Sequence, residues 1–227
     1  MPGERNAAAR AVVLAGVLVV GAVGCGSDAG QKPDPEAVAL VRAANAQMER
    51  ESFRSTGSTT AFPGAKQETW SDPAQGLHME VTGGALGTVY CKDGTSYTSA
   101  GLFAEALRRR GKEITVPPRL QGMYVTTKAD GGCAVYYRIA ETAHRVPGRD
   151  GSVDGKRVSA VEVAEGGSKD VYSIEDATKR LLKLESRREG GEVSTTAYDS
   201  FGQSVTITLP VAEKVMPLDA FRYQVSG

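Results

Sequence analysis

The chain is poor in the residues on which most enzymes and metal proteins depend. Its 227 residues include 2 His, 3 Cys and 1 Trp, and aromatic residues make up only 6%. His78 and His144 lie far apart without a His-Glu-x-x-His motif, so the sequence predicts no zinc site. Gly-x-Ser-x-Gly, phosphate-binding and dinucleotide-binding motifs are missing as well. We therefore expect no metal, no cofactor and no local catalytic motif.

An excess of either charge is also lacking. The 27 Lys and Arg residues balance 27 Asp and Glu residues. Nucleic-acid-binding proteins usually carry a basic excess or a basic stripe, so this balance argues against a nucleic-acid partner. The basic cluster Arg108, Arg109 and Arg110 could meet lipid phosphates, but it is also typical of the C-terminal turn of a helix.

The remaining polar residues give no convincing catalytic group. Neighbouring carboxylates such as Glu162 and Glu165 are typical of solvated strand and turn positions. Residues 150–155 resemble a calcium loop but lack its acidic spacing and its closing Glu. Trp70, Tyr136 and Tyr137 could line a pocket or simply pack. A hydrolase with a triad assembled from distant residues is left as a remote alternative, and we expect the protein not to be an enzyme.

The N-terminus has the pattern of a bacterial lipoprotein signal. Arg5 and Arg10 precede an uncharged, apolar stretch at 11–23, which spans only about 20 Å as a helix and is too short to cross a bilayer of about 30 Å. The stretch ends in Ala-Val-Gly-Cys25, which resembles a lipobox with Ala22 in place of the usual Leu. We predict a signal peptide at 1–24 and lipidation of Cys25; an ordinary signal peptide that happens to end at a Cys is the alternative.

A small polar tether, 25–34, follows the predicted cleavage site. Removing 1–24 takes two of the 27 basic and one of the 27 acidic residues, so the formal charge becomes −1. Attraction to anionic headgroups is therefore not expected, and membrane attachment would rest on the acyl chains of Cys25. These features predict a protein held at the extracytoplasmic face of the bacterial cell membrane.

Two cysteines, Cys91 and Cys133, remain after lipidation. Export places them in an oxidising compartment, where an even pair usually forms a disulfide. Closing this loop would stabilise the fold by about 4 kcal/mol in the chain-entropy model. Two buried free thiols are the alternative, and a redox role is not favoured because there is no Cys-x-x-Cys motif.

The rest of the chain, 35–227, is predicted to form one α+β domain. Asp34, Pro35 and Glu36 form a helix start, and apolar residues at helical spacing extend the helix to about residue 51. Further helices are expected at 102–110 and 134–144, and a loop with two Asp-Gly turns at 147–155. Strands are expected at 53–61, 66–71, 77–82, 87–92, 95–99, 123–126, 158–164, 169–173, 181–187, 193–198 and 204–209.

One segment, 174–189, fits two interpretations. Its propensity suits a helix, but the regular spacing of the surrounding strands favours a strand after Thr178. Asp93-Gly94 is a hairpin signal between two of the strands. An up-and-down sheet this long must curl or close, so we predict a curled antiparallel sheet, or half-barrel, covered on one face by a few helices. Such an arrangement commonly encloses an apolar space.

Three stretches carry a resemblance to a known family. Residues 39–60, 153–158 and 198–210 resemble the opening, the middle and the end of actinobacterial lipoproteins of the LppX/LprG type. The resemblance implies a LolA-like lipoprotein-carrier fold, in which helices close a half-barrel over an apolar cavity that holds acyl chains. It marks an architecture and assigns no individual ligand-binding residue.

Two functions follow as hypotheses. The first is an anchored extracytoplasmic lipoprotein that binds or shuttles a lipid or other hydrophobic ligand. The alternative is a non-catalytic envelope interaction or sensory module that binds a protein partner. A connected apolar void beneath the helices would favour the carrier, and a sheet packed solidly against them would favour the module. The sequence identifies neither the ligand nor the partner nor the oligomeric state.

Overall fold

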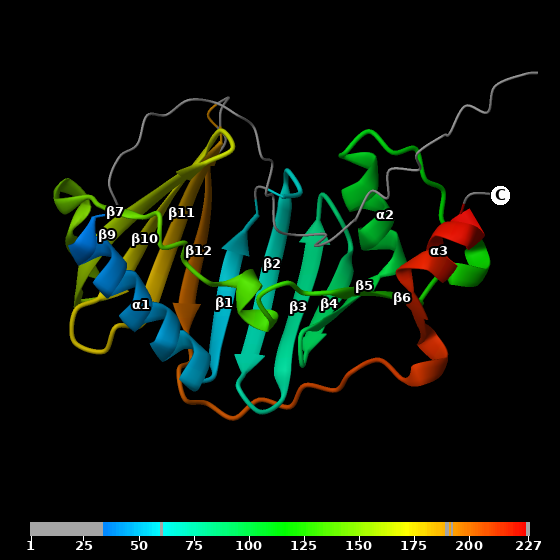
Figure 1. Cartoon of the computed structure of the whole chain (residues 1–227), viewed down its shortest axis with the longest axis horizontal. Coiled ribbons are helices and arrows are strands. Elements are labelled where there is room, and N and C mark those ends of the chain that lie inside the picture. Colours follow the sequence, from blue (N-terminus) through cyan, green and yellow to red (C-terminus); the bar gives the residue numbers. More distant parts are fainter. Residues whose placement is uncertain (1–33, 60, 189–190, 192, 226–227) are drawn as a thin grey trace, which may run out of the picture.

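The computed structural model describes residues 34–59, 61–188, 191 and 193–225. One thirteen-stranded sheet runs through this part of the chain in the order β13-β6-β5-β4-β3-β2-β1-β12-β11-β10-β9-β7, with β8 paired to β9 (Figure 1). All neighbours are antiparallel except β13 and β6. The strands are β1 (Phe53–Ser58), β2 (Ala65–Asp72), β3 (Gly76–Gly83), β4 (Gly87–Lys92), β5 (Thr95–Ser99), β6 (Tyr124–Lys128), β7 (His144–Arg145), β8 (Gly151–Val153), β9 (Lys156–Glu165), β10 (Ser168–Glu175), β11 (Leu181–Arg188), β12 (Val193–Asp199) and β13 (Val215–Pro217).

Three helices cover one face of this curled, unclosed sheet. They are α1 (Pro35–Arg50), α2 (Ala100–Arg108) and α3 (Leu218–Val225). Among the described strands, β7 and β13 lie at opposite ends of the sheet and do not pair with each other. The prediction of an α+β fold with a curled antiparallel sheet is confirmed. None of the helices in the described part of the chain is long and apolar enough to span a membrane.

Three buried hydrophobic clusters join the helices to the same face of the sheet. The first contains Val41 of α1 with Phe53 and Tyr198 of the sheet, and the second contains Leu102 of α2 with Val89. In the third, α2 and α3 pack over β6 and β13. We call this helix-covered side the inner face and the opposite side the outer face.

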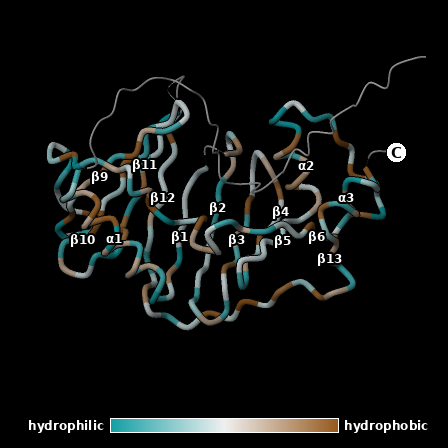
Figure 2. Tube along the Cα trace, viewed as in Figure 1, coloured by the Kyte–Doolittle hydropathy of each residue, from teal (hydrophilic) through white to brown (hydrophobic). Residues whose placement is uncertain are grey.

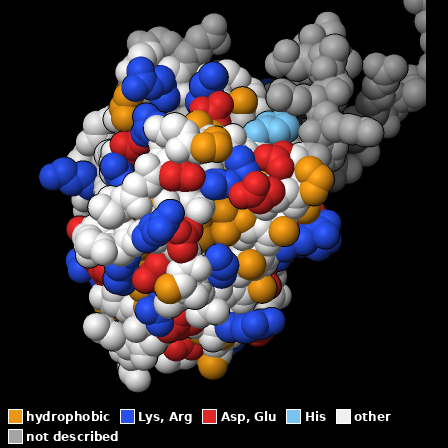
Figure 3. Space-filling view, turned by 90° about the vertical axis from the view of Figure 1, so that its left-hand side faces the viewer, with side chains coloured by type: hydrophobic (Ala, Val, Ile, Leu, Met, Phe, Trp, Pro, Cys, Tyr) orange, Lys and Arg blue, Asp and Glu red, His pale blue; other side chains and the backbone are white. Residues whose placement is uncertain are grey.

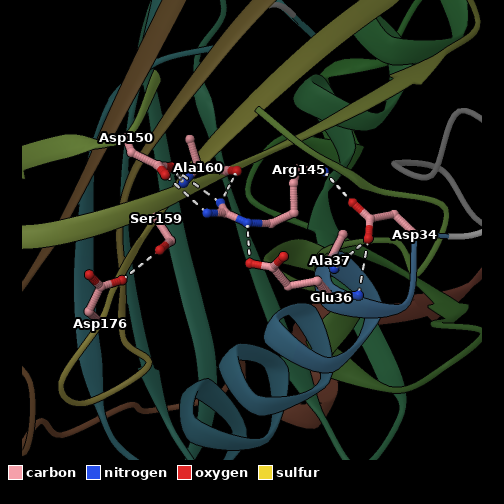
Figure 4. A network of polar contacts seen from close by, with 8 residues as sticks. All are labelled: Asp34, Glu36, Ala37, Arg145, Asp150, Ser159, Ala160 and Asp176. Carbon is pink, nitrogen blue, oxygen red and sulfur yellow. Dashed lines mark hydrogen bonds and ion pairs between the residues drawn. The ribbon is translucent and has the colours of Figure 1, made fainter. Parts of the chain in front are cut away.

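The start of α1 is fastened to the end of the sheet by Arg145 (Figure 4). Asp34 caps the helix by accepting from the Glu36 N–H at 3.0 Å, and its second carboxylate oxygen accepts from the Arg145 N–H at 3.0 Å. The Arg145 guanidinium, only 12% exposed, donates to Glu36 at 3.1 Å, to Asp150 at 3.0 Å and to the Ala160 carbonyl at 2.6 Å. The network ties the start of α1 to β7 and β9.

The prediction of a helix at 134–144 is wrong. The chain forms a short 3-10 turn, Cys133–Tyr136, and then extends to β7. The reason lies in Asn45 of α1, whose side-chain amide accepts from the Ile139 N–H and donates to the Ile139 carbonyl, both at 2.9 Å. Both backbone groups that a helix would bond internally are therefore taken by another element.

The prediction of a strand at 204–209 is also wrong. This segment is extended, and Val205, Ile207 and Leu209 are half-buried between exposed residues, but it forms no ladder with any described strand. The alternation that suggested a strand is present (Figure 2), and only the partner strand is missing from the described part of the chain.

The turn predictions were partly right. Asp93-Gly94 forms the β4–β5 hairpin with φ of +49° and +73°, which is the left-handed geometry that favours this pair. Asp154-Gly155 does the same between β8 and β9. The turn predicted at Asp150-Gly151 is wrong, because Gly151 begins β8. The preferred interpretation of 174–189 is confirmed, since β11 is a strand.

Candidate functional site

The side chains of the inner face change from hydroxyl-bearing at its centre to mostly apolar at one end. One cross-strand row runs from β12 over β1 to β13, and all of its members are buried. It consists of Tyr198, Ser55, Thr69, Met79, Val89, Thr98, Val125 and Met216. Towards β13 the row is mostly apolar, whereas over β1 and β2 it presents hydroxyl groups.

The hydroxyl-bearing centre extends over four neighbouring strands. Its members are Ser55, Thr69, Ser71, Ser186, Ser194 and Thr196, all less than a tenth exposed. A hydroxyl buried without a partner costs about 1–3 kcal/mol. Within the described structure the hydroxyls of Thr69 and Thr98, both on the inner face, have no hydrogen-bond partner. We call Ser55, Thr69, Ser71, Ser186, Ser194 and Thr196 the hydroxyl floor.

Two tyrosines flank the hydroxyl floor on the β10–β12 side. Burial, followed by the nearby negative charge of Asp170, raises the pKa of both Tyr172 and Tyr198. Asp170 faces Ser186 across the β10–β11 pair and accepts a hydrogen bond from its hydroxyl. Sequence reasoning missed this polar group, although the alternation in β10 places Asp170 and Tyr172 on one face.

The segment between β6 and β7 covers the middle of the inner face. The structure contains the predicted disulfide between Cys133 of this segment and Cys91 of β4. Tyr136 shares a hydrogen bond of 2.6 Å with the Ser96 hydroxyl, and burial raises its pKa. Tyr137 packs edge-on against Phe53 with ring centroids 5.1 Å apart, and burial raises its pKa to about 12.

A pocket opens where this segment meets the end of α1. It has a volume of about 350 Å³ and lies against the β2–β3 and β4–β5 turns. We call it the rim pocket; its lining includes Met48, Glu49, Ser71, Asp72, Pro73, Lys92, Asp93, Cys133, Ala134, Tyr137 and Arg138. Because Ser71 also belongs to the hydroxyl floor, the rim pocket adjoins the hydroxyl floor at this residue.

An ion pair crosses the rim pocket. Arg138 of the covering segment donates to Glu49 of α1 at 2.5 Å. Both side chains are nearly half exposed, at 47% and 41%. An ion pair this exposed contributes at most about 1 kcal/mol to stability, so it can break and re-form at little cost.

A larger hollow, with a volume of about 500 Å³, lies on the outer face of the sheet. Thr56, Ser58, Lys66, Glu68, Glu80 and Thr82 line it. Glu68 accepts from Arg54 at 2.8 Å and from the Trp70 indole at 3.2 Å. This places Trp70 on the outer face, away from the rim pocket.

The two histidines are not brought together. His78 lies on the outer face, stacked on Tyr90 with ring centroids 4.4 Å apart, whereas His144 lies in β7 at the edge of the sheet. Burial lowers the pKa of His78, and its Nε2 has no hydrogen-bond partner among the described residues. Across residues 34–59, 61–188, 191 and 193–225, no group of three His, Cys, Asp or Glu is placed to hold a metal ion.

Charges of both signs are mixed on the end of the molecule that Figure 3 shows. Basic and acidic side chains alternate there around a small apolar patch. This face has no block of a single charge that would attract an anionic surface. The predicted signal peptide, Cys25 and residues 26–33 of the tether lie outside the described residues.

The comparisons with known proteins bear on the fold alone. No family model and no curated protein matches the chain. An uncharacterized conserved protein from Thermus thermophilus aligns with a TM-score of 0.51 and 10% identity, over 80% of this chain and 99% of that one. At this identity the match shows a shared fold and nothing about activity.

Two other solved structures are less similar. MucB, in the Pseudomonas aeruginosa MucA/MucB complex, aligns with a TM-score of 0.42 and 14% identity, over 78% of this chain and 59% of that chain. The LolA superfamily protein NE2245 from Nitrosomonas europaea aligns with a TM-score of 0.30 and 11% identity, over 75% and 94%. Both TM-scores are under 0.5, so neither likeness carries an argument.

Proposed function

We propose that the protein is a lipid-anchored, extracytoplasmic, non-catalytic binding protein that holds an acyl-chain-bearing ligand against the inner face of its sheet. One observation carries the proposal. The inner face combines a buried apolar surface with the hydroxyl floor, and Ser71 of that floor also lines the rim pocket. The lipobox resemblance at Cys25 and the LppX/LprG-type resemblance of the sequence support the same function.

The chemistry of the face suits a ligand with an apolar body and a few polar groups. Burial of the apolar body would supply affinity at roughly 25 cal/mol per Å². Carbonyl or hydroxyl groups of the ligand would pair with the hydroxyls of Thr69 and Thr98, which have no partner among the described residues. A pure hydrocarbon would leave them unpaired, so an ester-linked or hydroxylated acyl ligand fits better.

Anchoring would come from the acyl chains of Cys25. The mixed charges in Figure 3 give no electrostatic reason for that end face to bind anionic headgroups. Two or three acyl chains are enough for stable attachment. The domain would then be attached through its tether to the extracytoplasmic face of the cell membrane.

The test is native mass spectrometry and lipid extraction of the full chain, purified from membranes in mild detergent. We expect a co-purifying lipid that exchanges with added lipid. Pro73→Trp, at an exposed position of the rim pocket, should reduce occupancy. Pro63→Trp is the matched control, because Pro63 is also an exposed turn proline and does not line that pocket. A folded protein without exchangeable lipid contradicts the proposal.

The same experiment distinguishes lipid binding from the alternative function, an envelope module that binds a protein partner. Its specific support is the tight packing of the helices, since Val41, Ala44 and Val89 are fully buried between helix and sheet. A folded, lipid-free protein that is crosslinked to one partner at the cell surface would favour this alternative.

A further inference from the structure

The segment that links β12 to β13 includes an uncharged, extended stretch that pairs with no strand of the described structure. We call residues 203–211 the strap. It runs along the lower edge of the sheet, past the ends of the intervening strands (Figures 1 and 2). No charged residue occurs between Asp199 and Glu213, in a chain in which 24% of residues are charged. Val205, Thr206 and Ile207 also have high strand propensity.

Two side chains hold the strap: the Ser52 hydroxyl donates to the Gln203 carbonyl at 2.7 Å, and Gln75 bonds its middle. Gln75, in the β2–β3 turn, accepts from the Ile207 N–H at 2.9 Å and donates to the Val205 carbonyl. Its amide therefore acts as one peptide unit of a neighbouring strand would. Because the backbone groups of successive residues point to opposite sides of an extended chain, Thr206 and Thr208 direct their N–H and C=O groups away from Gln75.

These outward groups form a free edge. Thr206 and Thr208 are exposed, and their backbone groups make no backbone hydrogen bond to any described residue. Natural proteins usually protect such edges with charges, bulges or covering elements. The strap has none of these along 204–209, and Pro210 ends it. An unprotected edge of this kind favours the addition of another strand.

We propose that the strap pairs with the strap of a second copy of this chain, antiparallel and centred on Thr206. The sequence is self-complementary in that register: Thr206 faces its counterpart, and Ser204 faces Thr208. All three carry outward backbone groups, so each facing pair can exchange two hydrogen bonds. The hydroxyl side chains would lie opposite one another, which is a favourable cross-strand pairing.

The paired segment is bounded on one side by Pro210 and on the other by a turn in which Ser200 and Gly202 have φ of +54° and +73°. The absence of charge means that two straps meet without repulsion. One strand from each copy makes an interface well below about 1,000 Å², so we expect a weak, reversible dimer. A two-fold contact of this type closes on itself and does not propagate.

The first test is site-specific crosslinking of the full chain in membranes. Hydrogen-bonded antiparallel pairs have Cα atoms about 5.5 Å apart, within the range of a disulfide. Thr206→Cys should therefore give a covalent dimer on mild oxidation, with a disulfide joining the two introduced thiols in the peptide map. Thr195→Cys, at an exposed position of β12, is the control and should give far less.

The second test exchanges charges at the two-fold axis. Chains carrying different tags are co-expressed, and co-purification is measured. Thr206→Lys in both chains should lower it at least about fivefold, and Thr206→Lys with Thr206→Glu should restore it. Thr195→Lys should leave it unchanged. Equal crosslinking of both cysteine variants, crosslinking of Thr206→Cys only to another protein, or failure of the charge exchange would each overturn the proposal.

Discussion

Single amide side chains replace missing backbone partners at two places in this fold. Asn45 binds both backbone groups of Ile139, and Gln75 binds one group each of Val205 and Ile207. In both cases a segment that looks regular in the sequence is held in an irregular position. Asn and Gln suit this role because their side chains carry the same donor and acceptor as a peptide.

Replacing Asn45 should destabilise the covering segment more than the rest of the fold. Asn45→Ala leaves the Ile139 N–H and C=O without their partner, so we expect the free energy of unfolding to fall by about 2 kcal/mol. Urea unfolding measures this change. Gln47→Ala on the same helix is the control, because among the described residues the Gln47 side chain bonds only to the side chain of Glu51, at the end of the same helix. Equal effects of the two substitutions would contradict the assigned role of Asn45.

His78 should make stability depend on pH. Burial lowers its pKa in the folded protein, so below about pH 6.5 the unfolded chain binds more protons. The free energy of unfolding should therefore decrease as the pH falls through this range, and it should be fully restored at neutral pH. Urea unfolding at pH 7.5 and pH 5 should show a smaller difference for His78→Gln than for His144→Gln. The same pH difference in both variants would show that His78 is not responsible.

At the scale of elements, the sequence predicted what depends on local pattern. Asp34 and Pro35 begin α1, and Asp93-Gly94 forms a hairpin, because capping and turn chemistry act over a few residues. The helix expected at 134–144 does not form because Asn45, which is distant in sequence, bonds both backbone groups of Ile139. The rim pocket and the hydroxyl floor could not be predicted, since they depend on which strands lie side by side.

The Cys91–Cys133 disulfide is the covalent link that holds the covering segment on β4. Replacing both cysteines with Ser should lower the free energy of unfolding by about 4 kcal/mol, because the unfolded chain regains the freedom of the open loop. Urea unfolding with and without a reducing agent measures the effect. The double variant should no longer respond to the reductant. A wild-type protein whose unfolding is equally insensitive to it would contradict the prediction.

At the scale of the whole molecule, ligand entry depends on how α1 and the covering segment meet. α1 is held at both ends: Arg145, only 12% exposed, bonds its start, and Arg180 bonds Glu51 at its end, where the two side chains are 26% and 19% exposed. Between these contacts, the Glu49–Arg138 ion pair across the rim pocket is exposed and can break at little cost. The entrance should therefore be at the rim pocket.

Arg138→Gln tests that entrance because it removes the ion pair and leaves the clusters beneath α1 intact. Loss of an exposed pair should change the free energy of unfolding by less than about 1 kcal/mol. The rate of lipid exchange, followed by native mass spectrometry with isotopically labelled lipid, should nevertheless increase. Arg42→Gln is the matched control, since Arg42 forms a similarly exposed pair with Glu141, and neither residue lines the rim pocket. If both variants exchange lipid at the wild-type rate, the Glu49–Arg138 contact does not control entry, and the ligand must reach the inner face elsewhere.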